Sequence, residues 1–340
     1  MCQYLHLFSS RTESLLKDDT LKALSITHTD LDGVASSAAF LRSRNIVEYE
    51  VVFTEPDSLH STLNKLSKEM EKYELISITD LGPNPGSIEV SLEALSIAER
   101  KGKQVIWIDH HIWDKSWIEE ATSVGIELEV DTSTCATGIA SRYSQGDSFL
   151  EELSRAVCSA DEWRFDDENA PWLVRFVGFT RDIDWLRRAH KVFMDVGSMK
   201  ELLEKARPRT IEVHDIELRY SSEFLKEVII ESRRGIKVAF GIKREPEVSA
   251  SLLAQLMLAR FDADIAAILN EKGKLEFRSN KCNVREIAFQ LGGGGHPKAS
   301  GAPVPVGIKT ILPILPHNLR TILIARPILK AAERVGCIPV

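Results

Sequence analysis

Acidic and imidazole side chains follow three separate apolar runs of the sequence, directly after each run ends. In chain order these side chains are His28, Asp30 and Asp32, then Asp80, then Asp109, His110 and His111. Carboxylates held close together repel one another unless a cation lies between them. Carboxylates mixed with imidazoles suit divalent ions such as Mn²⁺ or Mg²⁺. The set predicts a metal site, and it has enough ligands for two ions that share one carboxylate.

Each of these residues taken alone has an ordinary explanation. A single Asp after a strand is usually a turn former or a helix N-cap. Asp161, which follows the run VCSA, is the least informative, because Asp166 and Asp167 lie nearby. Coincidence is harder to accept for the three run ends together, since all of them carry the same chemistry.

The elements around these residues predict how they are brought together. Short β-rich runs alternate with helical patterns through the first half of the chain, as in LKALSIT and GVASSAAFLRSRN. This alternation is typical of a parallel sheet covered by helices on both faces. Sites in such sheets form beyond the carboxyl ends of the strands, which is where the three groups lie. We therefore expect an α/β fold whose parallel-sheet N-terminal domain carries the site.

The rest of the chain predicts a connector and a second, smaller α/β domain. The stretch from about Asp147 to Gly235 has mainly helical patterns, and the runs IKVAFGI, ADIAAILN and KLEFRS predict strands after it. We expect a catalytic domain over residues 1–163, a helical connector over 164–235 and a substrate-binding domain over 236–340.

Four consecutive glycines, Gly292 to Gly295, precede His296 in the second domain. Glycines permit close backbone approach, and their N–H groups can bind an anion. Arg278 ends a predicted strand and can donate to a phosphate. A helix C-cap at Gly292 is the ordinary alternative, but a cap needs one glycine. The four glycines, Arg278 and His296 therefore predict a phosphate or nucleotide site.

Composition narrows the classes of partner. The net charge of −7 and the pI of about 5.8 argue against nucleic-acid binding through a general basic field. Five scattered cysteines show neither metal spacing nor a disulfide framework, which favours a reducing cytoplasm. No apolar run reaches membrane-spanning length, and the polar start does not resemble a signal peptide.

In this order, the motifs HTDLDG, TDLG and DHH, followed by a later Asp, resemble those of the DHH phosphoesterase superfamily. The segments FRSN, Phe277 to Asn280, and GGGGHPKASGA, Gly292 to Ala302, resemble the DHH-associated C-terminal domain. The size and the DLGPNP context are similar to those of archaeal RecJ-like proteins and bacterial nano-RNases.

The resemblance implies a role for each residue. His28, Asp30 and Asp80 would hold a first metal ion. The second ion would be held by Asp32, Asp80, His110 and Asp161, or by Asp166 or Asp167 in place of Asp161. Asp109 would orient a histidine, and His111 would face the scissile phosphate. The implied cofactor is a pair of Mn²⁺ ions, with Mg²⁺ as the alternative.

The implied activity is hydrolysis of single-stranded RNA or DNA oligonucleotides to mononucleotides. Alternative substrates are cyclic or linear dinucleotides and 3′-phosphoadenosine 5′-phosphate. An inorganic pyrophosphatase ranks last, because that family lacks the glycine-rich C-terminal pattern. A replication-complex scaffold is the non-enzymatic alternative, and the retained ligand set argues against it. A homodimer or a replication-complex partner is compatible with this interpretation, and we expect no membrane partner.

Overall fold

The computed structural model describes residues 21–144, 146–178, 182–270, 273–304 and 317–340. The chain forms two compact units. The N-terminal unit comprises Met1–Ser154 and His190–Asp195, and the C-terminal unit comprises Arg155–Ala189 and Val196–Val340. Among the described residues, no helix combines the length and the apolar character needed to cross a membrane.

The N-terminal unit is built on a five-stranded sheet in which every neighbouring pair is parallel, in the order β2-β1-β3-β4-β5. Its strands are β1 (Lys22–Thr27), β2 (Glu48–Phe53), β3 (Leu75–Thr79), β4 (Gln104–Asp109) and β5 (Glu127–Val130). All of β3, and all but the first residue of β1 and of β4, are buried, as expected for central strands covered on both faces. The predicted parallel sheet is confirmed.

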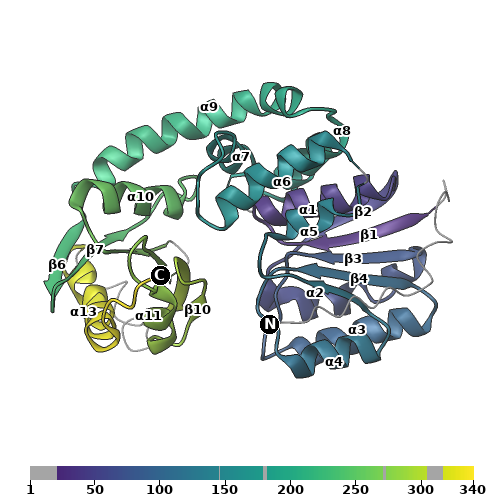
Figure 1. Ribbon diagram of the computed structural model, residues 1–340, viewed down its shortest axis with the longest axis horizontal. Coiled ribbons are helices and arrows are strands. Elements are labelled where there is room, and N and C mark those ends of the chain that lie inside the picture. The colour runs from purple at the N-terminus through teal and green to yellow at the C-terminus, as the bar shows by residue number, and fades with distance from the viewer. Residues whose placement is uncertain (1–20, 145, 179–181, 271–272, 305–316) are drawn as a thin grey trace. The chain divides into compact units, whose positions relative to one another are not determined.

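Helices cover both faces of this sheet. They are α1 (Leu31–Ser43), α2 (Leu59–Leu66), α3 (Ile88–Arg100), α4 (Lys115–Ser123) and α5 (Ala136–Ser141). In Figure 1, α1 and α5 lie over one face, and α2, α3 and α4 lie over the other. The apolar sides of α2 and α3 pack with β1, β3 and β4 in one core that includes Leu63, Leu92 and Trp107.

Two helices connect the units, because α6 (Ser148–Asp161) and α8 (Ile183–Asp195) each contribute residues to both. Between and after them lie α7 (Ala170–Val177) and the long α9 (Met199–Phe224), both in the C-terminal unit, and the bounds of the predicted helical connector stay a prediction. Within those bounds lies β6 (Ile229–Arg233), which pairs antiparallel with β7 (Ile236–Ile242). Four of the five β6 residues are exposed, and such an edge strand lacks the apolar pattern that marks a buried strand.

The C-terminal unit contains a six-stranded mixed sheet in the order β10-β11-β9-β8-β7-β6. Its further elements are α10 (Ala250–Phe261), β8 (Ile265–Leu269), β9 (Lys274–Arg278), α11 (Val284–Gln290), β10 (Gly294–Gly295), β11 (Ala299–Pro303) and α13 (His317–Val335). Only β7 and β8 are parallel among these strands. Helices α11 and α13 share one core with the sheet, whereas α9 and α10 contribute to another, which also contains Trp163.

A disulfide joins Cys282 to Cys337 in the C-terminal unit, with the two Cα atoms 4.8 Å apart. The tail beyond Cys337 lies along the segment before α11, where the Asn283 N–H donates to the Ile338 carbonyl at 2.7 Å. The expectation that the cysteines form no disulfide framework is therefore wrong. The separation of 55 positions between the two cysteines conceals the pairing in the sequence.

Candidate metal centre

His28 and Asp30 lie between β1 and α1, where the chain turns from strand to helix. Asp30 is the N-cap of α1, and its carboxylate accepts a hydrogen bond from the Gly33 N–H at 3.0 Å. A side chain at position 33 would place its Cβ 2.5 Å from the His28 carbonyl oxygen. The glycine of HTDLDG is therefore needed for this tight turn. The turn brings His28 Nδ1 to 3.0 Å from Asp30 Oδ2.

Asp32 is 1% exposed and faces the N-terminus of α5. Its two carboxylate oxygens accept the backbone N–H groups of Ala136 and Thr137, both at 2.8 Å. The Thr137 hydroxyl donates to it at 2.6 Å. These three donors fix the carboxylate and stabilise its charged form. The carboxylate fixed in this way also lies near His110, whose Nε2 is 3.9 Å from Asp32 Oδ2.

Asp80 follows β3 in a left-handed backbone conformation, with φ of 56°. Its N–H donates to the Ile108 carbonyl of β4 at 3.0 Å, which holds the turn against the neighbouring strand. The side chain is 2% exposed. Oδ2 is buried and accepts no hydrogen bond within the described residues, although His28 Nδ1 lies 3.4 Å away. A buried carboxylate oxygen without a hydrogen bond is costly unless a cation compensates it.

The three side chains of the DHH segment, at the end of β4, have different contacts. His110 is buried, and its Nε2 lies 3.3 Å from Asp80 Oδ1 and 3.9 Å from Asp32 Oδ2. His111 directs Nδ1 to Asp109 at 2.8 Å. The other Asp109 oxygen accepts the Trp113 indole N–H at 2.7 Å. The fully buried Asp109 therefore orients His111 rather than joining the cluster.

Gly82 is the last residue of the TDLG motif, and its surroundings explain why a glycine is needed there. A Cβ at this position would lie 2.8 Å from Cγ of His111, so only glycine leaves room for the imidazole ring. The side chain of His111 is 39% exposed. Because Nδ1 faces Asp109, the opposite nitrogen Nε2 is the one that can face a ligand.

Charge coupling sets the pKa values in the cluster. Burial alone would lower the pKa of His111, but the Asp109 carboxylate outweighs burial and raises that pKa to about 8. Burial would raise the pKa of Asp30, but His28 outweighs it, and the pKa lies well below its usual range. Asp30 and Asp109 both have a lowered pKa, so both are carboxylates at neutral pH.

Two overlapping groups in the N-terminal unit have the donors for a metal ion. One is His28, Asp30 and Asp80, and the other is Asp80, His110 and His111; within each group the ligand atoms lie within 4.8 Å of one another. Asp80 belongs to both groups. Carboxylate and imidazole donors at this spacing fit divalent cations, and the buried Oδ2 atom of Asp80 supports that fit.

The substrate residues predicted in the C-terminal unit lie close together. Arg278 ends β9 and pairs in register with Ala299 of β11, which follows the turn that begins at His296. The guanidinium of Arg278 donates to the Ser251 hydroxyl at 2.9 and 3.1 Å. The pKa of Arg278 is lowered, because burial outweighs the negative charges of Glu276 and Asp161, which act to raise it. Asp161 ends α6 in this unit, and its role as a metal ligand stays a prediction.

The glycines of the run Gly292 to Gly295 have structural roles that the sequence alone does not indicate. Gly292 has φ of 78° and directly follows Leu291, the C-cap of α11, and its N–H donates to the Phe289 carbonyl at 3.0 Å. A Cβ at Gly293 would lie 2.0 Å from the Gly301 carbonyl oxygen, and one at Gly295 would lie 2.7 Å from Ser300 Cα. Three of the four glycines are thus required by the positive φ after α11 and by close packing on β11. A Cβ at Gly294 meets nothing within 4 Å.

Sequence reasoning missed Glu55, which follows β2 at the same edge of the sheet. Its carboxylate accepts the Thr29 hydroxyl at 2.9 Å and lies 3.6 Å from His28 Nε2. The position of Glu55 directly after β2, which is another strand of this parallel sheet, is the feature that could have identified it. The segment TEPDS has the composition of an ordinary turn, because Pro and Asp are typical turn residues.

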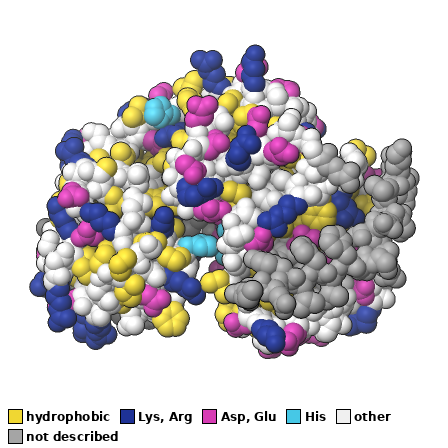
Figure 2. Space-filling model, in the orientation of Figure 1, with side chains coloured by type: hydrophobic (Ala, Val, Ile, Leu, Met, Phe, Trp, Pro, Cys, Tyr) yellow, Lys and Arg dark blue, Asp and Glu magenta, His cyan; other side chains and the backbone are white. Residues whose placement is uncertain are grey.

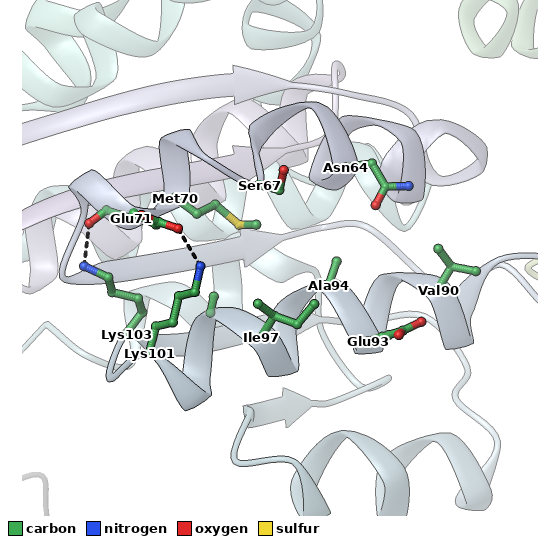
Figure 3. A pocket seen from close by; sticks show the side chains of 11 residues that line it. Asn64, Ser67, Met70, Glu71, Val90, Glu93, Ala94, Ile97, Lys101 and Lys103 are labelled. Atoms are coloured by element: carbon green, nitrogen blue, oxygen red, sulfur yellow. Dashed lines mark hydrogen bonds and ion pairs between the residues drawn. The ribbon is translucent and has the colours of Figure 1, made fainter.

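A groove of about 250 Å³ lies elsewhere in the N-terminal unit, between α2 and α3 (Figure 3). Apolar side chains such as Met70, Ala94 and Ile97 line it, and Lys101 and Lys103 bond to Glu71 at one end. Lys103 directly precedes β4, whereas the metal-binding groups follow the strands. None of the predicted site residues lines this groove.

Lysine and arginine side chains are interspersed with aspartate and glutamate over the face shown in Figure 2. This distribution agrees with the acidic net charge of −7. The described part of this face therefore shows charges of both signs rather than one continuous basic surface.

Residues 235–312 match the family model described as the DHHA1 domain. No curated protein sequence matches the chain significantly.

Among solved structures, the chain resembles RecJ in complex with Mn²⁺ from Thermus thermophilus, with a TM-score of 0.60 and 13% identity. That match covers 94% of this chain and 53% of the other, so the chain spans about half the length of that RecJ. Another exonuclease RecJ bound to manganese gives a TM-score of 0.52 and 14% identity, with coverage of 93% and 91%.

The pGpG-specific phosphodiesterase PggH from Vibrio cholerae also gives a TM-score of 0.52 with 14% identity, and the match covers 91% of this chain and 99% of PggH. Identities this low carry the fold and not the substrate. The chain therefore contains a region that matches the DHHA1 domain, and it shares the two-domain α/β fold of the RecJ and PggH structures.

Proposed function

We propose that the protein is a metal-dependent phosphodiesterase that hydrolyses short single-stranded oligonucleotides to mononucleotides, with Mn²⁺ as its metal. The observation that carries this proposal is the environment of Asp80. Its buried carboxylate is shared by two ligand groups, and one of its oxygens accepts no hydrogen bond from the described residues. A bound cation would compensate a buried carboxylate oxygen in this state.

Each residue then has a definite task. His28, Asp30 and Asp80 would hold one ion, and Asp32, Asp80, His110 and Asp161 would hold a second. When bound, two such ions supply an activated water and offset the charge on the phosphoryl oxygens. Asp109 holds His111 through Nδ1 at 2.8 Å, so that Nε2 can donate to the scissile phosphate. The charge of His111 then stabilises the negative charge that develops there.

The C-terminal unit would hold the nucleotide. Arg278 keeps two donors on the Ser251 hydroxyl and lies beside the turn that begins at His296. A guanidinium held in this way is preorganised for a phosphate or a base. The open position of Gly294 leaves the backbone accessible at that point. We expect Arg278, His296 and the glycine loop to select the substrate, and the N-terminal unit to supply the chemistry.

End-labelled RNA and DNA of graded length, from dinucleotides to about 20-mers, would test the proposal with Mn²⁺ present. We expect labelled mononucleotides from short single strands and little cleavage of a matched duplex. Intact substrates at every length would contradict the proposed activity. A product ladder without mononucleotides would contradict the exonucleolytic mode.

A dinucleotide phosphodiesterase is the second candidate. The observation that favours it is the match to the pGpG-specific phosphodiesterase over 99% of that protein. The same graded series separates the two, because a dinucleotide-specific enzyme would leave trimers and longer strands intact.

A further inference from the structure

Glu55 contacts two consecutive residues at the edge of the proposed metal centre. One oxygen of its carboxylate accepts the Thr29 hydroxyl at 2.9 Å, and the other lies 3.6 Å from Nε2 of His28. The side chain is 29% exposed, which places it at the border between the cluster and solvent. No motif of the chain includes Glu55, and none of the roles assigned above uses it.

The backbone around Glu55 is fixed on both sides. Thr54 extends the pairing of β2 with β1, since its N–H donates to the Thr27 carbonyl at 2.9 Å. Pro56 follows and disfavours a helical conformation for the residue before it. Glu55 accordingly has φ of −102° and ψ of 155°, and its carbonyl accepts the Ser58 N–H at 2.9 Å. Because the backbone is held, the carboxylate is directed at the end of β1.

His28 presents its two ring nitrogens to different groups. Nδ1 lies 3.0 Å from Asp30 Oδ2 and 3.4 Å from Asp80 Oδ2, which are the atoms that a cation would join. Nε2 faces Glu55 on the opposite side of the ring. A histidine that binds a metal must offer a lone pair on one nitrogen and carries its hydrogen on the other.

We propose that Glu55 is a positioning residue for the metal centre, holding the Nε2–H of His28 so that Nδ1 is directed at the cation. This inference rests on the proposed metal-dependent function. Glu55 would fix both the ring orientation and the tautomer, as carboxylates next to metal-bound histidines do. The distance of 3.6 Å is longer than a hydrogen bond, and we expect it to shorten when Nδ1 carries an ion. Thr29 holds the other oxygen and so limits rotation of the carboxylate.

The test is direct titration of the metal-free protein with Mn²⁺, read by the electron paramagnetic resonance signal of free Mn²⁺. Glu55→Gln should raise the Kd about 10- to 100-fold, the usual effect of losing such a partner. Asp57→Asn is the matched control, because it removes a negative charge two residues away in the same turn. The Asp57 carboxylate accepts the Ser58 hydroxyl at 2.8 Å, so we expect its replacement to leave the Kd unchanged.

A double-mutant cycle shows whether Glu55 acts through His28. In a His28→Ala background, Glu55→Gln should cause no further loss of Mn²⁺ affinity. An unchanged Kd in Glu55→Gln, or an undiminished effect without His28, would overturn the proposal. The melting temperature of each metal-free variant reports folding. Glu55→Asp replaces Glu55→Gln if the latter does not fold, and an unchanged Kd there counts equally against the proposal.

The outcomes also separate this inference from the function on which it rests. Wild-type protein that binds no Mn²⁺ would reject the metal centre and the role of Glu55 together. Wild-type protein that binds Mn²⁺ with the same Kd as Glu55→Gln would reject only the role of Glu55.

Discussion

His111 and Asp80 differ in what they contact, and their replacements should therefore have different effects. Nδ1 of His111 is held by Asp109, whereas Asp80 belongs to both groups of potential ligands. We predict that His111→Ala lowers turnover about 100- to 1000-fold, as loss of a donor to developing charge does, while Mn²⁺ stays bound. Asp80→Ala should abolish turnover and reduce the amount of bound metal.

Metal content measured beside turnover distinguishes the two variants. Gln104→Ala is a suitable control, because Gln104 begins β4, the strand that His111 follows. Its side chain donates to Glu127 at 3.1 Å. If His111→Ala loses metal as readily as Asp80→Ala, His111 is a ligand rather than a group that faces the phosphate.

The sequence is enough to predict which residues form the cluster, but not which other residues hold them in place. His28, Asp30, Asp80 and His110 could be placed together because parallel strands end at one edge of a sheet. The three donors to Asp32 come from residues more than 100 positions away along the chain. Glu55 lies in a polar turn, and the indole N–H that holds Asp109 belongs to a residue with no motif signal. Contacts of this kind follow from packing, which local patterns do not encode.

At the scale of elements, the glycine loop after α11 allows structural and binding roles to be separated. Gly293→Ala should lower the free energy of unfolding by about 1–3 kcal/mol or more, because its Cβ would clash with β11. Gly294→Ala should leave stability nearly unchanged, since a Cβ there meets nothing within 4 Å. If the loop holds substrate, Gly294→Ala should nevertheless slow oligonucleotide cleavage. Urea unfolding and turnover would be measured on both variants, and equal stability losses would contradict the packing account.

We expect His190 of α8 to make the free energy of unfolding depend on pH. Nε2 of its ring lies 3.0 Å from the Ser37 hydroxyl, and the ring packs beside Tyr49 and Phe53. Burial lowers the pKa of His190 from 6.5 to about 3. Below pH 6.5 the unfolded chain binds a proton here that the folded chain does not. The free energy of unfolding should therefore fall by about 1.4 kcal/mol per pH unit from this group as the pH drops toward 3.

His190→Gln should remove that slope, because glutamine does not titrate. Urea unfolding at several values between pH 7.5 and 5 would measure it, with the exposed His214→Gln as a control. Identical pH slopes for the wild type and His190→Gln would show that His190 is not held neutral in the folded state.

Elements were predictable where their patterns were long and amphipathic. The strands β1, β3 and β4 and the helices α1 and α3 lie where apolar periodicity indicates them. Between β2 and β3 the helical structure is broken, since α2 ends at Leu66 and a separate 3-10 turn covers Glu69–Lys72. The short strands β10 and β11 contain glycines and a proline, which local propensity disfavours in strands. Pairing within the sheet overrides that propensity.

At the scale of the whole molecule, the proposal assigns chemistry to one unit and substrate choice to the other. Loss of a charged hydrogen bond typically costs about 1.5–3 kcal/mol, so Arg278→Ala should slow cleavage of dinucleotides and short oligomers about 10- to 150-fold. Hydrolysis of bis-p-nitrophenyl phosphate, which lacks a nucleotide, should fall much less. Lys274→Ala, at the start of the same strand, is the control. Equal losses on both substrates with metal still bound would show that Arg278 supports the catalytic centre instead.

The most direct test of the central claim is the rate of oligonucleotide hydrolysis as Mn²⁺ is returned to exhaustively chelated protein. We predict no turnover without metal, and recovery on addition of Mn²⁺ that Ca²⁺ does not match, because carboxylate and imidazole ligands favour Mn²⁺. Asp80→Asn should not recover at the Mn²⁺ concentration that restores the wild type. Full turnover of the chelated wild-type protein would contradict the account.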